Sequence, residues 1–196
     1  FDKEASSQLL VGGVERPLAK DNISGAIAER NAWEKDMRES NLMSPDEIDK
    51  ELMRIDGMIG SAQKALKEST NNANIMADIW NSDEVLDYKD KEDKKAVNSF
   101  TNQTLGENPD YSNPANRQAV FTIAEKTGVI PESYISYVRK TQFSSDPVMV
   151  MDGVNTLDSL LATRPEFKDQ FSSKDIAFAD SVTSFVAAGM SPEEAV

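Results

Sequence analysis

The stretches AVFTIAEKTGVIPES (residues 119–133) and DSVTSFVAAGMSPEE (residues 180–194) share one local pattern. In each, a helical run ends at a glycine, Gly128 or Gly189, and a proline begins the next helix three residues later. Glycine adopts the left-handed conformation that commonly ends a helix, and proline suits the first helical position. The pattern predicts short helices joined at sharp corners. Both the ordinary corner chemistry of helical proteins and a duplicated helix-hairpin unit of about 60 residues would produce it.

The region after residue 113 is expected to form a compact bundle of short helices. No segment shows the alternating pattern of a strand for more than four residues, so the whole chain is predicted to be all-α. The helix at 173–188 has apolar residues on two sides, which places it at the centre of the predicted bundle. We expect these helices at about 114–127, 131–143, 146–163, 165–171, 173–188 and from 191.

The region before residue 108 is expected to be extended and built on long helices. Residues 1–20 contain a glycine pair and Pro17, which predict an irregular opening segment with about one helical turn. A helix capped by Asp21 or Asn22 is predicted to run to about Glu39. The next begins at Ser44 and carries a seam of a coiled coil or long hairpin. The seam contains Ile48, Leu52, Ile55, Ile59, Ala62, Leu66, Ser69, Ala73, Met76 and Trp80.

Continuity of this long helix is left open by the sequence. An unbroken helix over residues 44–80 would be about 55 Å long. Gly57 and Gly60 each weaken a helix interior, or they let a neighbouring helix approach closely.

A further helix is predicted from Ser82 to about Leu105, with an exposed charged face in its middle. The segment from Gly106 to Asn113 is rich in proline, asparagine and glycine, and is expected to separate two domains. These are an extended helical portion at 1–107 with long antiparallel helices, and a compact bundle at 108–196. We interpret the chain as a fragment of a longer protein whose C-terminal bundle is truncated, because it begins at Phe1 and ends just after a new helix start.

The composition excludes several classes of function. The 196 residues carry a net charge of −13, which disfavours binding to nucleic-acid backbone or to an anionic membrane surface. Cysteine and histidine are both absent from the sequence, which removes thiol chemistry, histidine-based triads and the usual zinc ligands. No apolar run approaches the length of about 20 residues that spans a bilayer. We therefore predict no catalytic, cofactor-binding or metal-binding residue, no cofactor and no transmembrane segment.

One pair of residues deserves a catalytic hypothesis. Glu132–Ser133 is similar to the Glu-Ser step of lytic transglycosylases, although the glycine-rich motif expected after it is absent. The alternative interpretation is that the pair simply begins a helix, which the preceding Pro131 favours.

The C-terminal region resembles the large internal (ejection) virion proteins of short-tailed bacteriophages. The resemblance covers under half of the chain, and its motifs are helix corners. It rests on residues 113–119, 126–131, 138–140, 145–147, 164–165, 175–179 and 188–196.

The resemblance implies a non-enzymatic helical segment that is packed inside the virion and delivered to the host periplasm during genome ejection. Protein partners are then other virion proteins or a second copy, joined through the Ile48–Trp80 seam. The alternatives are a fragment of a peptidoglycan-cleaving virion enzyme and a cellular helical adaptor.

Overall fold

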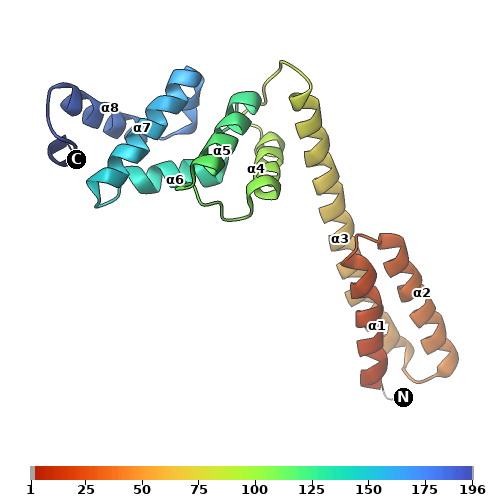
Figure 1. Cartoon of the computed structure of the whole chain (residues 1–196). Helices are drawn as coiled ribbons and strands as arrows, with labels where there is room; N and C mark the ends of the chain where they lie inside the picture. Colours follow the sequence, from red (N-terminus) through yellow and green to blue (C-terminus); the bar gives the residue numbers. More distant parts are fainter. Residues whose placement is uncertain (1–2, 196) are drawn as a thin grey trace. The chain divides into compact units, whose positions relative to one another are not determined.

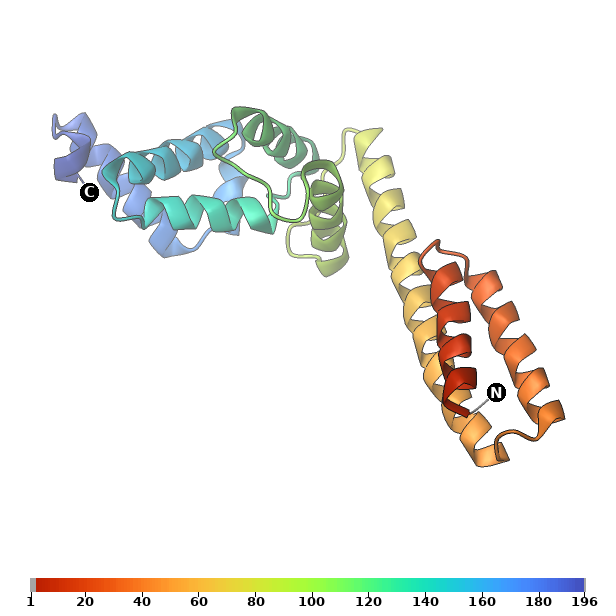
Figure 2. The ribbon, with the colours of Figure 1, turned by 60° about the horizontal axis from the view of Figure 1, so that its bottom comes forward.

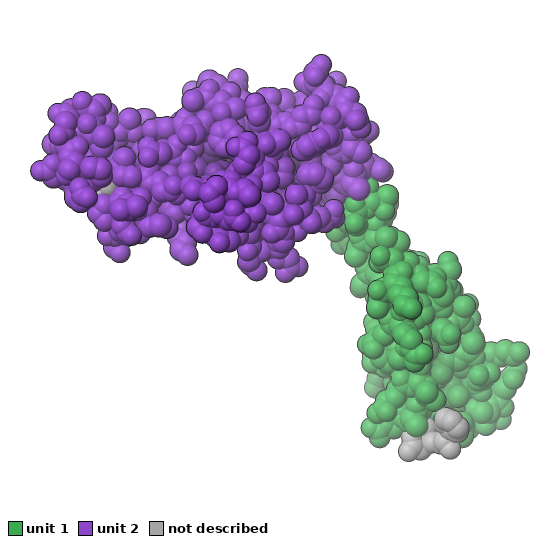
Figure 3. Space-filling model, in the orientation of Figure 1, with its two compact units in different colours: residues 1–70 green, residues 71–196 purple. Residues whose placement is uncertain are grey.

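The computed structural model describes residues 3–195 and is all-α, as predicted (Figure 1). It is 79% helical, and no strand occurs in the described residues. The chain divides into two compact units, residues 1–70 and residues 71–196 (Figure 3). The elements are α1 (Lys3–Leu18), α2 (Ile23–Ser40), α3 (Pro45–Trp80), α4 (Lys91–Leu105), α5 (Pro114–Thr127), α6 (Glu132–Gln142), α7 (Pro147–Thr163), the 3₁₀ helix η1 (Pro165–Gln170), α8 (Ser173–Ala187) and α9 (Pro192–Ala195).

The first unit packs α1, α2 and the first half of α3 side by side (Figure 2). Its core contains Leu10 and Val14 of α1, a segment predicted to be irregular. These two residues lie one helical turn apart and face the same side, so their burial stabilises a full helix despite Pro17 in its last turn. The prediction for residues 1–20 was therefore wrong.

The predicted starts of α2 and α3 are confirmed by their capping contacts. The Asn22 side chain accepts a hydrogen bond from the backbone N–H of Gly25 at 2.9 Å. Ser44 and Glu47 form a reciprocal pair in which the Ser44 N–H donates to the Glu47 carboxylate at 2.8 Å. Helix α3 is continuous over 36 residues. A Cβ on Gly57 or Gly60 would meet nothing within 4 Å, so neither glycine serves a close helix approach.

The boundary between the units lies inside α3 and not at 107/108, the predicted position. Met76 near the end of α3 shares a core with Ala96 and Val97 of α4, Ile123 of α5 and Val129. Helix α4 and the last turns of α3 therefore belong with the helices that follow them.

The helix expected from Ser82 begins only at Lys91, which is a second correction. Asp90 caps it, accepting from the N–H groups of Glu92 and Asp93. The preceding residues instead lie against the end of α5, because the Leu86 N–H donates to the Thr127 carbonyl at 2.8 Å. This contact with a distant part of the chain replaces the helical hydrogen bonds that the local charge pattern favours.

The helices after residue 113 follow the prediction closely. Gly128 and Gly189 adopt the expected left-handed conformation, with φ of 75° and 97°. The two corners differ in packing, since Val129 is buried after the first and Met190 is 43% exposed after the second. Whether they descend from a duplication stays an open prediction.

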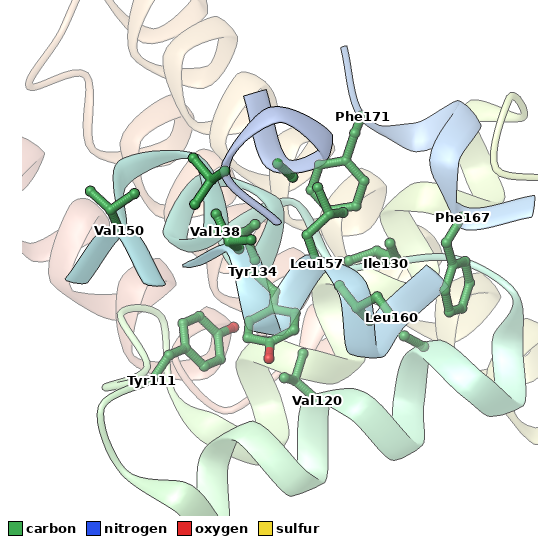
Figure 4. Packing of buried hydrophobic residues seen from close by; sticks show 14 of the residues in the cluster. Tyr111, Val120, Ile130, Tyr134, Val138, Val150, Leu157, Leu160, Phe167 and Phe171 are labelled. Atoms are coloured by element: carbon green, nitrogen blue, oxygen red, sulfur yellow. The ribbon is translucent and has the colours of Figure 1, made fainter. Parts of the chain in front are cut away.

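Helix α7, and not α8, is the centre of the second unit (Figure 4). Its Val150, Val154, Leu157 and Leu160 are all buried. On α8, Ala179 and Val182 are buried, whereas Phe185 near the end of the helix is 46% exposed.

Candidate interaction site

An open groove of about 810 Å³ lies between α1 and α2. None of its lining residues comes from α3, which packs against the same two helices through their buried residues. It is lined by Ser6, Leu9, Leu10, Gly13, Arg16, Pro17 and Lys20 of the first helix and its end, and by Asn22, Glu29, Ala32, Trp33, Asp36, Met37, Ser40 and Leu42 of the second.

The two helices that form the groove are fixed to each other by specific contacts. The indole N–H of Trp33 donates to the Ser6 carbonyl oxygen at 3.0 Å in a buried position. At Gly13 a Cβ would lie 3.5 Å from Oε2 of Glu29, which is ordinary van der Waals contact. These two contacts also fix the position of one helix along the axis of the other, because Ser6 is level with Trp33 and Gly13 is level with Glu29.

The floor of the groove is apolar and partly open to solvent. Leu9 is 60% exposed and Leu42 is 39% exposed, whereas Trp33 at the floor is only 8% exposed. The groove thus combines two exposed leucines with a nearly buried tryptophan. Such surfaces, with aromatic anchors and charged edges, are typical of protein–protein contact sites.

The walls of the groove carry opposite charges. Arg16 and Lys20 lie on the α1 side, and Glu29 and Asp36 lie on the α2 side. None of these four side chains forms an ion pair within the described part of the chain.

The charges on the other side of α2 are paired. Arg30 donates to Asp56 of α3 at 2.9 Å, and Arg38 donates to Asp49 of α3 at 2.7 Å. Between them, Glu34 accepts from both arginines, and the hydrogen bond from Arg38 is the largest cause of its lowered pKa. Charges that face α3 are thus satisfied inside the unit, while those that face the groove are available to an outside partner.

Glu132, the residue of the catalytic hypothesis, lies at the edge of a second cavity of about 380 Å³. Lys94, Asp169 and Arg139 also line this cavity. Glu132 is the first residue of α6, as the alternative interpretation held, and its backbone N–H donates to the Asn98 side chain at 2.9 Å. The Ser133 hydroxyl is engaged with the Tyr111 hydroxyl at 2.6 Å.

Arg139 at this cavity forms an ion pair with a buried carboxylate. Its Nε donates to Asp175 at 2.7 Å, and the Asp175 side chain is only 5% exposed. Burial raises the pKa of Asp175, but the hydrogen bonds from Arg139 and Ser172 outweigh it and leave the pKa below its ordinary value. The pair therefore holds α6 against the start of α8 and is not a free catalytic group.

A cluster of tyrosines forms the most polar part of the second core. Tyr111, Tyr134 and Tyr137 contact one another through their rings, with centroid separations of 4.9–5.9 Å. The Tyr137 hydroxyl donates to Asp152 at 2.7 Å, and Arg117 pairs with the same carboxylate. Burial raises the pKa of Tyr134 and of Tyr137 to about 12, so both are neutral hydrogen-bonding groups at ordinary pH. The cluster is a structural network that joins α5, α6 and α7.

The predicted seam does not form one surface. Ile48, Leu52, Ile55 and Ile59 are buried in the first core, and Met76 is buried in the second unit. Leu66 between them is 38% exposed, in a stretch where few residues are buried. The groove that replaces the seam as candidate site was missed because residues 1–20 were not expected to be helical. The four-residue spacing of Ser6, Leu10 and Val14 was the signal that could have found it.

Within residues 3–195, no group of carboxylates has the geometry of a metal site. No described helix combines the length and the apolar composition that crossing a membrane requires.

No family model, no curated protein and no solved structure matches this chain.

Proposed function

We propose that the chain is a non-enzymatic helical interaction segment of a bacteriophage internal virion protein that takes part in genome ejection. The observation that carries the interaction role is the groove between α1 and α2, with its exposed Leu9, its tryptophan floor and its unpaired charged walls. The virion class rests on the resemblance of residues 113–196. In this proposal the protein resides in the virion interior, and it reaches the host periplasm with the ejected genome.

The groove takes the place of the Ile48–Trp80 seam as the proposed contact surface. A partner could reach the first half of the seam only by displacing α1 and α2 from Leu52 and Ile55, which are 4% and 0% exposed. Burying a Leu or Ile side chain contributes about 1.5–3 kcal/mol, so that displacement would cost much of the stability of the unit. A substitution such as Leu52→Asp would therefore unfold the unit and would not report on association.

The virion assignment is tested on particles of the phage that encodes this sequence. An antibody raised against the chain should detect it in purified particles and should detect much less after genome release is triggered. A major capsid protein, which stays in emptied particles, is the control. Absence of the chain from purified particles would refute the assignment.

The peptidoglycan-cleaving alternative is favoured by one observation, the cavity beside Glu132 with two cationic side chains at its edge. Its test compares the chain with a Glu132→Gln variant in a muralytic assay. Activity that disappears in the variant would support the enzyme, and no activity in the parent chain would exclude it for these residues.

A further inference from the structure

The occupant of the α1–α2 groove is constrained by its floor and by its walls. The floor presents Leu9, Trp33 and Leu42, so the occupant must supply an apolar stripe. The walls present cations from α1 and anions from α2, so it must also present anions toward α1 and cations toward α2. A peptide with only basic or only acidic side chains would be attracted by the charges of one helix and repelled by those of the other.

The α1–α2 face of the chain itself meets these requirements. A two-fold axis parallel to the helices and lying between two stacked faces places α1 of each copy opposite α2 of the other. This symmetry brings unlike walls together on both sides, because an isologous interface repeats every contact twice. An axis across the helices would instead stack α1 on α1 and bring like charges together.

The same axis keeps residues of equal height opposite each other. Glu29 is level with Gly13 within one chain, and Arg16 lies one turn farther along α1. Arg16 of one copy therefore comes within a turn of Glu29 of the second copy, a separation that an extended arginine side chain spans. Leu9 also lines the groove, and its side chain is 60% exposed.

We infer that the α1–α2 face that carries the groove is covered by the same face of a second copy of this chain, in a two-fold dimer that pairs Arg16 with Glu29 across the interface. This deepens the interaction function proposed above and rests on that part of it. A face about 24 Å long and two helices wide covers about 500 Å² per copy, or about 1,000 Å² in total. That area is at the low end for specific complexes, so the dimer is expected to be a micromolar one.

The test is sedimentation equilibrium of the whole chain over a concentration series through the micromolar range, with circular dichroism as the check on folding. The parent should show a concentration-dependent monomer–dimer equilibrium. Leu9→Ser, which changes a 60% exposed side chain, should abolish the dimer and keep the helical spectrum. Met53→Ser is the matched control, because Met53 is 76% exposed on α3 and does not line the groove.

Charge reversal identifies the pairing. Arg16→Glu and Glu29→Arg each place like charges at both symmetric contacts, so each variant alone should dimerise about tenfold more weakly than the parent. An equimolar mixture of the two variants should dimerise like the parent, since each mixed dimer contains two opposite-charge pairs. No rearrangement within one chain can produce that recovery.

Three outcomes would overturn the inference. They are a parent that remains monomeric throughout the series, a dimer that tolerates Leu9→Ser, and a mixture that is no better than its two components. A monomeric parent that is nevertheless found in virions would leave the proposed function standing, with a different virion protein in the groove. Absence from virions combined with a dimer would refute the function and keep the dimer.

Discussion

Replacing Gly153 by alanine tests the close contact of α7 with α6 in the second unit. A Cβ at this position of α7 would lie 2.6 Å from the backbone nitrogen of Gln142 and 2.6 Å from Oγ1 of Thr141. Ordinary van der Waals contact begins at 3.4 Å, so the shortfall is 0.8 Å (3.4 − 2.6). The nitrogen of Gln142 belongs to the last turn of α6 and cannot rotate away, so α6 and α7 must move apart.

The expected cost follows from two opposing effects. Overpacking of a core costs about 1–3 kcal/mol, and the contact with backbone places this substitution at the upper end. Alanine is better than glycine in a helix interior by about 1 kcal/mol, which offsets part of the loss. The free energy of unfolding of the second unit should therefore fall by about 2 kcal/mol.

Segment-resolved amide hydrogen exchange measures this change in one unit without interference from the other. The opening free energy of amides in α6 and α7 should fall together in Gly153→Ala. The matched control is Gly60→Ala in α3, where an added Cβ meets nothing within 4 Å, so that helix should gain up to about 1 kcal/mol. A Gly153→Ala protein as stable as the parent, or more stable, would refute the close packing of α6 on α7.

Three other predictions concern titrating and buried polar groups. The hydrogen bond from Lys3, followed by those from Ser44, lowers the pKa of Glu47 to about 2. The stability that this contact gives the first unit should be fully present above the ordinary pKa of 4.5 and should be lost as pH falls toward 2. Acid titration followed by tryptophan fluorescence should show this loss. The Glu47→Gln variant should lack this pH dependence. Because burial raises the pKa of Tyr134 and Tyr137 to about 12, the second unit should lose stability as pH rises from 10 to about 12. If the absorbance of these tyrosinates titrated near pH 10 in the folded protein, the prediction would be contradicted. The side-chain amide nitrogen and oxygen of Gln142 are both buried without a hydrogen-bond partner. Gln142→Met should therefore stabilise the second unit by about 1 kcal/mol in urea unfolding. A loss of stability of similar size would show that the amide is hydrogen-bonded in solution.

The helix corners were predictable because their causes are local. Gly128 and Gly189 end helices in the left-handed conformation, and Ser44 and Asn22 cap the helices that follow them. In each case the conformation depends on a few neighbouring residues and on the chemistry of one side chain. Such features persist whatever the rest of the chain does.

The errors occurred where distant contacts decided the conformation. Residues 82–90 have a charge pattern that favours a helix, yet Leu86 is held by the Thr127 carbonyl. Residues 3–18 contain two glycines and a proline, yet burial of Leu10 and Val14 against α2 and α3 makes them helical. In both segments tertiary contacts outweigh intrinsic preferences, which are worth about 1 kcal/mol or less for most residues and about 3 kcal/mol for a proline in a helix interior.

The sequence by itself determined the all-α class, the corners and most helix boundaries, since capping and periodicity act over one or two turns. Only the tertiary structure decided that α3 is shared between two cores, that α7 is the central helix of the second unit, and that the Ile48–Trp80 seam is divided between the units. It also created the candidate site, because Arg16 and Glu29 are far apart in any local pattern and lie on opposite walls only when α1 packs on α2. A groove is a property of two packed helices, and neither helix contains it alone.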